Sequence, residues 1–578
     1  MLATATVLAI YLSVLAVMPK HVFCSPDEGG RFFELRSVEW RDGLTRTIPY
    51  PGRDFDPSYQ FFPTSRIYPR LRPDGSIQLP WPAWFPLLSQ IPLAAFGMTG
   101  IYLVPLFSGL LVALLAGVLA YEHSPRLAPL AVLVVGLASP VFFYSLAFWE
   151  HTLATLLAML GVVVVVVGGR RPSSLLAAIP IALLACMLRL EMVAFVVALA
   201  AAVVLSNLRA PASSVTVSRT SPSWRFSRPG LRLTGLALIF GLGVTFVLAI
   251  PSYRAGMLWW GLPSRREGLS FFARVPRGLL QIFINTELNG GPLIDRQWEL
   301  LALGAVAATV LAAFVRRSRV EASLIFPALV VILSLSAWLA WTPPLHRSLH
   351  GLVPIAPYVV IAAYAVPHAW RQRQRPLLFL SLITTLYLVC GIAAVMVFYL
   401  APWGLETTLE WGPRYLLTAY PLLAILTVLA ARTYWRSTRP AAQRVAFVTL
   451  LAVLTGISAL QQARGLQMVY DNRQTAAGWD RVLRKHGPIV TNVWWLPSAV
   501  AELATSRELF FVYDRAAYEE WLAEARRRQL REFTFASMGP LKMKSRQTRL
   551  LGATRRQLLY VSRLRLRPLT NDRGQPNP

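Results

Sequence analysis

The sequence has little cysteine and little charge for its length. Only Cys24, Cys186 and Cys390 occur among 578 residues, and they lie far apart. Two of them fall inside long apolar runs, so we expect neither a disulfide framework nor a CxxC metal site. No zinc-finger spacing and no module combining arginine with aromatic residues accompanies the net charge of +29. Nucleic acid is therefore not an expected partner.

Charge is missing from long stretches of the chain. Hydrophobic residues make up 55% of the sequence, and residues 153–167 and 324–341 carry no charge at all. Apolar runs of roughly 17–25 residues are typical of transmembrane helices, and about 13 such runs are present. They lie near residues 2–18, 98–120, 127–146, 152–167, 174–188, 192–208, 233–250, 300–315, 323–341, 352–366, 377–400, 415–431 and 445–460. The sequence therefore predicts an α-helical polytopic membrane protein.

The connections between these runs alternate in charge. One set is basic and contains Arg170, Arg316, Arg371 and Arg432, together with the Ser/Pro/Arg-rich linker at about 209–232. The alternate set contains Glu150, the pair Arg189 and Glu191, Arg347, and Glu406 with Arg414. Basic connections face the cytoplasm. We therefore expect a multi-pass protein of the cell membrane with a cytoplasmic N-terminus and an extracytoplasmic C-terminus.

Two domains are predicted. Residues 1–462 form the membrane domain, with outer loops at about 19–97 and 251–298. Residues 463–578 form a small extracytoplasmic α/β domain, because short apolar runs at 488–493, 509–513 and 532–536 read as strands around a helix at 516–529. Residues 558–566 alternate as an edge strand would. The tail lacks a Gly-rich phosphate loop and a nucleophile elbow, so we expect a lid or docking domain rather than a second active site.

Residues 23–43 contain two adjacent carboxylates, Asp27 and Glu28, soon after the first apolar run. Carboxylates are costly to hold ionised near hydrocarbon, so this pair indicates either catalysis or the acidic cap of a following helix. Apolar and charged positions alternate at helical spacing from Phe32 to Trp40. That pattern predicts a helix lying flat on the membrane surface, with Trp40 and the arginines at head-group level.

Other candidate residues lie in the predicted outer turns. Glu150 and His151 suit a divalent cation or a phosphate, and the alternative is a helix cap with an interfacial histidine. Arg414 follows Gly412-Pro413, and its guanidinium suits a phosphate, whereas the alternative is a snorkelling arginine. Arg189 and Glu191 are expected to neutralise one another. His346 and His350 are expected to be solvated, because no third ligand is near in sequence.

Several motifs resemble C-type membrane glycosyltransferases, in the branch of protein O-mannosyltransferases and bacterial aminoarabinose transferases. They are the Asp27-Glu28 pair after the first helix, the Pro-rich segment at 79–97, Glu150 in AFWEH, and WGPRYLL at 411–417. The predicted layout of about 13 helices followed by an outer α/β domain matches the aminoarabinose transferases. The chain departs from that branch in Gly29-Gly30-Arg31 and in lacking a lysine in the Pro-rich segment.

The resemblance implies the C-type glycosyltransferase fold and a function. A sugar would pass from a polyprenyl-phosphate donor to a hydroxyl of a lipid, glycan or protein at the extracytoplasmic face, with inversion. Asp27 would be the base and Glu28 would orient it. Arg31, Glu150, His151, Trp411 and Arg414 would bind substrate. The only cofactor implied is a candidate divalent cation at Glu150 and His151.

The alternative function is a transporter or flippase for a lipid-linked glycan. A transporter needs polar or broken helices at mid-membrane, and the central thirds of the apolar runs are nearly free of charge. The long outer loop with its acidic pair and the predicted outer domain favour the enzyme. An enzyme similar to O-antigen ligases, with related chemistry, is a third option.

Overall fold

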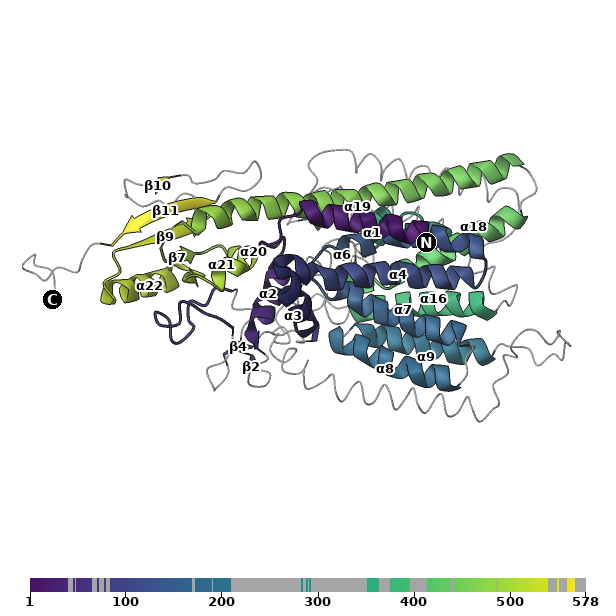
Figure 1. Ribbon diagram of the computed structural model, residues 1–578, viewed down its shortest axis with the longest axis horizontal. Coiled ribbons are helices and arrows are strands. Elements are labelled where there is room, and N and C mark those ends of the chain that lie inside the picture. The colour runs from purple at the N-terminus through teal and green to yellow at the C-terminus, as the bar shows by residue number, and fades with distance from the viewer. Residues whose placement is uncertain are drawn as a thin grey trace, which may run out of the picture. The chain divides into compact units, whose positions relative to one another are not determined.

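The chain divides into two compact units. The structure, a computed structural model, describes residues 1–39, 45–46, 48–64, 70–71, 77–78, 84–168, 172–189, 191–208, 282–283, 287–288, 291–292, 351–362, 375–395, 413–437, 441–485, 487–538, 548–549 and 559–566. The first unit, here the helical unit, comprises Met1–Leu15 and Val104–Leu466. The second, here the sheet unit, comprises Ala16–Leu103 and Gln467–Pro578. Figure 1 shows the elements of both units.

The helical unit is built from apolar helices. They are α1 (Leu2–Val17), α4 (Leu103–Tyr121), α5 (Ala128–Leu137), α6 (Pro140–Tyr144), α7 (His151–Val167), α8 (Pro172–Leu188), α9 (Met192–Leu208), α14 (Leu352–Ile355), α16 (Arg375–Val395), α18 (Ala419–Ser437) and the first part of α19 (Ala441–Leu483). Short 3₁₀ helices, Pro125–Leu127 and Arg414–Leu416, precede α5 and α18. The helices α7 and α8 lie side by side, as do α9 and α16 (Figure 1).

The first helix is fixed in the helical unit by a close backbone approach. Gly136 of α5 leaves room for the side chain of Val7, since a Cβ at this position would lie 2.8 Å from Val7 Cγ1. The hydroxyl of Tyr11 donates to the carbonyl of Gly136 at 2.9 Å, and its ring stacks on Phe142 at 5.0 Å. A buried phenol keeps a hydrogen-bond partner in this way while its ring fills apolar space.

Most helices within the described ranges lie where apolar runs predicted them, but two boundaries were wrong. The predicted run at 127–146 is broken, because Pro140 begins α6 and Ser139 accepts from the amide of Val141 at 3.2 Å. The predicted run at 445–460 is only part of α19, which is 43 residues long, since no proline follows until Pro488. The runs at 233–250, 300–315 and 323–341 lie outside the described residues.

Three helical segments in the described part of the chain are long and apolar enough to cross a membrane, Trp84–Tyr121, Pro376–Val395 and Phe447–Leu483. The first includes α3 (Trp84–Phe96) and the 3₁₀ helix Gly97–Tyr102. Residues 84–96, which were expected within the outer loop at about 19–97, form a helix. Pro86 is the third residue of α3, within its first turn, where a missing amide hydrogen costs no helical hydrogen bond.

The sheet unit contains a five-stranded sheet with the order β10-β11-β9-β7-β8. Its strands are β7 (Ile489–Thr491), β8 (Leu509–Phe511), β9 (Glu532–Ser537), β10 (Thr548–Arg549) and β11 (Tyr560–Arg565). Strand β7 pairs in parallel with β8 and β9, while β11 is antiparallel to both β9 and β10. The predicted strands and helix of the tail are confirmed. The expectation that residues 558–566 form an edge strand was wrong, because β10 covers that edge.

Helices connect the parallel strands. Helices α20 (Leu496–Ala499) and α21 (Ala501–Ala504) follow β7, and α22 (Arg515–Arg527) joins β8 to β9. Asp514 caps α22 by accepting from the amide of Ala517 at 2.8 Å. Three pairs of two-residue strands are also present: β1 (Val38–Glu39) with β2 (Thr45–Arg46), β3 (Arg70–Leu71) with β4 (Ile77–Gln78), and β5 (Glu287–Leu288) with β6 (Gly291–Pro292).

The segment 48–64 packs onto β8. The amide of Phe511 donates to the carbonyl of Phe61 at 2.9 Å, and Phe55 lies 4.8 Å from the ring of Phe510. Asp56 holds the segment together by accepting from the hydroxyl of Tyr50 at 2.9 Å and the amide of Phe61 at 2.7 Å. Burial and the nearby Asp56 charge raise the pKa of Tyr50 well above its usual value.

Candidate functional site

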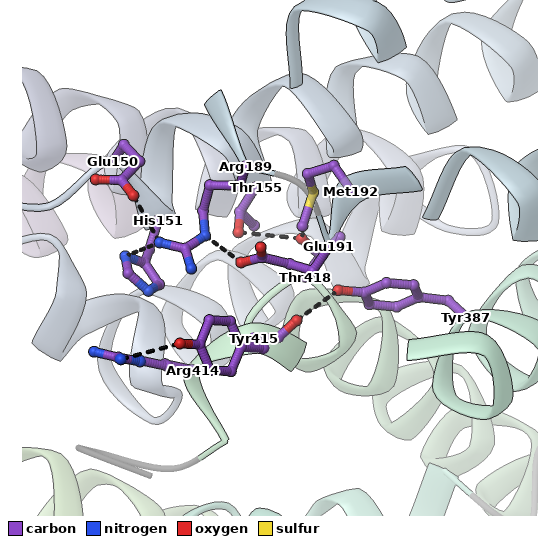
Figure 2. A network of polar contacts seen from close by, with 10 residues as sticks. All are labelled: Glu150, His151, Thr155, Arg189, Glu191, Met192, Tyr387, Arg414, Tyr415 and Thr418. Atoms are coloured by element: carbon purple, nitrogen blue, oxygen red, sulfur yellow. Dashed lines mark hydrogen bonds and ion pairs between the residues drawn. The ribbon is translucent and has the colours of Figure 1, made fainter. Parts of the chain in front are cut away.

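A cluster of charged side chains lies where four helix ends of the helical unit meet (Figure 2). This charged cluster comprises Glu150 and His151 at the start of α7, Arg189 and Glu191 in the turn between α8 and α9, and Arg414 with Tyr415 in the 3₁₀ helix before α18. Glu150, His151, Glu191, Arg414 and Tyr415 are all buried. The sequence predicted that these turns lie on one side, and the structure brings their residues together.

Arg189 is the centre of the charged cluster. Its Nη1 donates to Glu150 Oε1 at 2.6 Å and to His151 Nδ1 at 3.2 Å, and its Nε donates to Glu191. The backbone of Arg189 is fixed at the end of α8, because its amide donates to the carbonyl of Ala185. One guanidinium therefore joins the first turn of α7 to the first turn of α9.

Arg414 and Arg189 both face the ring of Tyr415. Their guanidinium carbons lie 5.0 Å and 5.2 Å from its centroid, respectively. Nη2 of Arg414 also donates to the Tyr415 hydroxyl at 3.0 Å. The charge of Arg189 is shared with Glu150 and Glu191. The guanidinium of Arg414 has the planar fork that matches the oxygens of a phosphate.

Neutral side chains support the charged cluster from below. Tyr387 of α16 donates from its hydroxyl to the carbonyl of Tyr415 at 3.2 Å, and Thr155 and Thr418 share a hydrogen bond at 3.2 Å. The hydroxyl of Thr418 also lies 4.0 Å from Met192 Sδ. These contacts connect α7, α9, α16 and α18 next to the charged side chains, so helices rather than a loop hold the cluster in place.

His151 is packed between aromatic rings. It stacks on Tyr144 with a centroid distance of 5.0 Å and lies 5.5 Å from Trp149. Within the described residues, no group of three or more histidine, cysteine, aspartate or glutamate side chains is arranged to hold a metal ion. Glu150 and His151 instead share Arg189, so the place predicted for a divalent cation faces a guanidinium.

The acidic pair lies in the sheet unit, on α2 (Pro26–Ser37). Asp27 is half-buried, whereas Glu28 is fully buried. The Glu28 amide donates to Ser25 Oγ at 3.1 Å, so a serine before the helix satisfies one of its first amides. The two adjacent carboxylates therefore have different surroundings, and only Asp27 has part of its surface open.

Both carboxylate oxygens of Glu28 are bound. Oε1 accepts from Nη2 of Arg473 in α19 at 2.8 Å, and Oε2 accepts from the amide of Cys24 at 2.8 Å. The guanidinium of Arg473 lies over the ring of Tyr102 at 4.6 Å. Arg473 is separated from Glu28 by 445 positions in sequence, and sequence reasoning did not identify it.

The helix that carries the pair is not a surface helix. Every described residue from Glu28 to Ser37 is buried except Arg36, and Arg31 pairs with Glu34 at 3.1 Å instead of facing head groups. The expected interfacial orientation is therefore corrected. Burial against protein and burial against lipid demand the same apolar spacing, so the pattern alone could not distinguish them. Trp40, Trp411, His346 and His350 lie outside the described residues.

A backbone contact sets the position of α2 in the sheet unit. A Cβ on Gly29 would lie 2.1 Å from the carbonyl oxygen of Ser498, at α20. The amide of Phe23 donates to the carbonyl of Ala499 at 3.0 Å. Only glycine allows this approach of two backbones. The turn after β7 therefore supports the helix that carries Asp27.

Replacing Gly29 with alanine is expected to force α2 away from α20. A methyl group 2.1 Å from a backbone carbonyl cannot be relieved by a side-chain rotation. We expect a loss of about 1–3 kcal/mol, as for other overpacked sites, measured as a lower unfolding midpoint of the full-length protein. The control is Gly478→Ala on α19, where nothing lies within 4 Å of the added Cβ. Equal midpoints for the two variants would refute the contact.

The chain is similar to solved membrane glycosyltransferases. It covers 97% of ArnT from Cupriavidus metallidurans bound to undecaprenyl phosphate, with 97% of this chain aligned, 13% identity and a TM-score of 0.48. It covers 69% of the archaeal oligosaccharyltransferase AglB from Archaeoglobus fulgidus, solved with an inhibitory peptide and a dolichol-phosphate, with 91% of this chain aligned, 14% identity and a TM-score of 0.40. AglB in complex with Zn and sulfate aligns at 13% identity with a TM-score of 0.43, covering 88% of this chain and 67% of AglB.

Both kinds of protein are C-type membrane glycosyltransferases, the group that the sequence motifs resemble. No protein-family model and no curated protein sequence matches the chain. At these identities and TM-scores the similarity does not identify a donor or an acceptor.

Sequence reasoning found part of the candidate site. It singled out Glu150, His151 and Arg414. It also expected Arg189 and Glu191 to neutralise one another, and they do form an ion pair, but it did not connect Arg189 with Glu150 and His151. It missed Tyr415 and Tyr387 as supporting residues. Tyr415 stands in the WGPRYLL motif beside Arg414, so the motif was the available signal. Tyr387 lies in an apolar run with no signal of its own.

Proposed function

We propose that this protein is a membrane glycosyltransferase that uses a sugar carried on a polyprenyl phosphate. The observation that carries the proposal is the charged cluster, in which the nearly buried Arg189 joins the buried Arg414, Glu150, Glu191 and His151 among apolar helices. Ionisable groups among apolar helices are costly and mark functional sites. The motifs around Asp27 and Arg414 supply the reaction class.

The reaction is a single displacement at the anomeric carbon. The oxygen of an acceptor hydroxyl forms a bond to that carbon, while the bond between the carbon and the phosphate oxygen breaks. The electron pair leaves with the polyprenyl phosphate, the hydroxyl proton passes to a base, and the configuration inverts. Catalysis then needs a carboxylate for the proton and cations for the departing phosphate.

The residues divide these tasks by their chemistry. Arg414 binds the phosphate oxygens together with Arg189, and both guanidinium groups contact the ring of Tyr415. Glu150, Glu191 and His151 hold Arg189 in place. Asp27, whose surface is partly open, accepts the proton. Arg31 and Trp411 remain predicted substrate residues.

Two further points belong to the proposal. A metal ion bound by Glu150 and His151 would face the positive charge of Arg189, which does not fit, so no step is assigned to a metal. Transfer takes place at the extracytoplasmic face, as the charges of the connecting loops predict. The acceptor is a lipid, a glycan or a protein.

Transfer can be tested with the full chain in lipid nanodiscs. Undecaprenyl-phosphate-linked hexoses and pentoses, each with a radiolabelled sugar, are added together with a total lipid and glycan extract of a bacterial envelope. The proposal expects release of undecaprenyl phosphate and movement of label to an acceptor with one of the donors. Movement of an intact labelled donor across a liposome membrane, without release of undecaprenyl phosphate, would instead support the transporter.

Arg414→Lys is expected to weaken donor use without disturbing the fold. Lysine keeps the charge but loses the two-pronged contact with phosphate. Hydrogen bonds to charged groups contribute about 1.5–3 kcal/mol, so we expect an increase in the donor KM of about tenfold or more. Binding of undecaprenyl phosphate, measured by native mass spectrometry, should weaken in parallel. Arg436→Lys, an exposed site on α18, is the matched control. An unchanged KM for Arg414→Lys would make this residue a snorkelling anchor.

A further inference from the structure

We infer that Arg473 is a positioning residue that fixes Asp27 through Glu28. The inference rests on the proposed function, because it takes Asp27 to be the base. Glu28, Tyr102 and Arg473 all belong to the sheet unit, and none of them is part of the charged cluster.

The ion pair excludes Glu28 from contact with substrate. The side chains of Glu28 and Arg473 are both 0% exposed, and their atoms Oε1 and Nη2 lie 2.8 Å apart. The other carboxylate oxygen accepts from the Cys24 amide. With both oxygens bound and no open surface, Glu28 acts on its neighbours rather than on a sugar or a hydroxyl.

Glu28 closes a turn around Asp27. Its side chain accepts from the amide of Cys24, its amide donates to Ser25 Oγ, and the amide of Gly29 donates to the Ser25 carbonyl at 3.2 Å. Asp27 lies within this turn. Its backbone is therefore fixed by the direction in which the Glu28 carboxylate is held, and Arg473 sets that direction.

Arg473 is itself held from two more sides. Its guanidinium lies 4.6 Å from the centroid of Tyr102, and Nη1 lies 3.6 Å from Met18 Sδ. The Tyr102 hydroxyl reaches the carbonyl of Lys20 at 3.5 Å. The segment 18–28 and the ring of Tyr102 thus both contact the guanidinium of Arg473. A base must stand within hydrogen-bond reach of the hydroxyl, and a shift of about 1 Å can cost about 10²-fold in rate.

Replacing both Glu28 and Arg473 shows whether their ion pair only stabilises the fold or also positions Asp27. Removing one partner of a buried ion pair leaves an uncompensated charge and is strongly destabilising, whereas replacing both by uncharged residues is often tolerated. Stability should therefore return in Glu28→Gln/Arg473→Met, while the direction of the turn is lost. The position of residue 27, and not the midpoint of unfolding, is the decisive readout.

The test uses the full chain in nanodiscs with Cys24, Cys186 and Cys390 replaced by serine. A spin label is placed at Asp27→Cys, or at Ser506→Cys as an exposed control in the same unit. In the double variant we expect the label at 27 to become mobile while the label at 506 does not change. An immobile label at 27 overturns the inference.

Transfer is measured in parallel on unlabelled protein with Asp27 intact. The double variant should keep its unfolding midpoint near that of Arg473→Lys and its KM for the undecaprenyl-phosphate sugar, while kcat falls by about 10²-fold. Arg473→Lys keeps a charge on Glu28 and should recover part of kcat. A double variant with the wild-type kcat overturns the inference. A mobile label at 27 in a protein that transfers no sugar leaves the positioning contact in place and removes the proposed function instead.

Discussion

Replacing Asp27 with asparagine is expected to lower turnover by about 10²–10⁴-fold, the usual contribution of a general base. Asparagine has nearly the same shape and still forms hydrogen bonds, but it cannot accept the proton of the attacking hydroxyl. Asp27 is half-buried, and the neighbouring Glu28 side chain and Ser25 hydroxyl, which hold the turn, are unchanged by the substitution. Binding of undecaprenyl phosphate should therefore persist. Transfer from the active donor, followed in nanodiscs at saturating donor, measures the loss.

The matched control is Asp514→Asn. Asp514 caps α22 through its side chain, so this substitution reports what asparagine does at a carboxylate that only begins a helix. Asparagine caps about as well as aspartate, and activity should hardly change. If Asp27→Asn stays within about threefold of wild type, as Asp514→Asn should, the acidic pair is structural. The base would then have to be sought elsewhere.

Periodicity and charge were sufficient to predict the parts of the fold that depend on local sequence. Apolar runs predicted α7, α8 and α9 nearly to their ends, short apolar runs predicted β7, β8 and β9, and the helix expected between the last two strands is α22. The break before α6 was missed because Pro140 starts a new helix after a capping serine while hydropathy continues across it. Hydropathy indicates which residues avoid water, but it does not show where one helix ends and the next begins.

The sequence predicted only those parts of the candidate site that follow from the order of the helices and the charge of their connections. Alternating loop charge placed Glu150, Arg189 and Arg414 at the same ends of their helices, because antiparallel helices return to one side at every second turn. The pairing of Glu28 with Arg473 across 445 positions had no such signal. An arginine in a stretch of helix with other charged residues is usually solvated, and only the fold shows that this one is buried against Tyr102.

The second large effect is expected for Arg189→Gln. Arg189 is bound to Glu150, Glu191 and His151, and its side chain is only 11% exposed. Removing its charge leaves two carboxylates buried among apolar helices. Loss of one partner from a buried ion pair costs about 3–5 kcal/mol, and here two carboxylates depend on the same cation. The unfolding midpoint of the full-length protein in detergent should fall accordingly.

Two further variants separate the charge from the site. Arg515→Gln removes an arginine whose ion pair with Glu519 is exposed, the two side chains being 91% and 59% exposed. Exposed pairs contribute about 0–1 kcal/mol, so this control should barely move the midpoint. Replacing Glu150, Arg189 and Glu191 together by glutamine removes the buried charges at once and should restore most of the lost stability.

The triple variant should nevertheless fail to bind undecaprenyl phosphate as tightly as wild type, because one of the two guanidinium groups at Tyr415 is gone. Stability and ligand binding would then respond differently to the same residues, as expected when a buried charge is kept for a ligand rather than for the fold. An Arg189→Gln midpoint no lower than that of Arg515→Gln would show that the cluster is open to water. Wild-type binding by the triple variant would show that Arg414 holds the phosphate without Arg189.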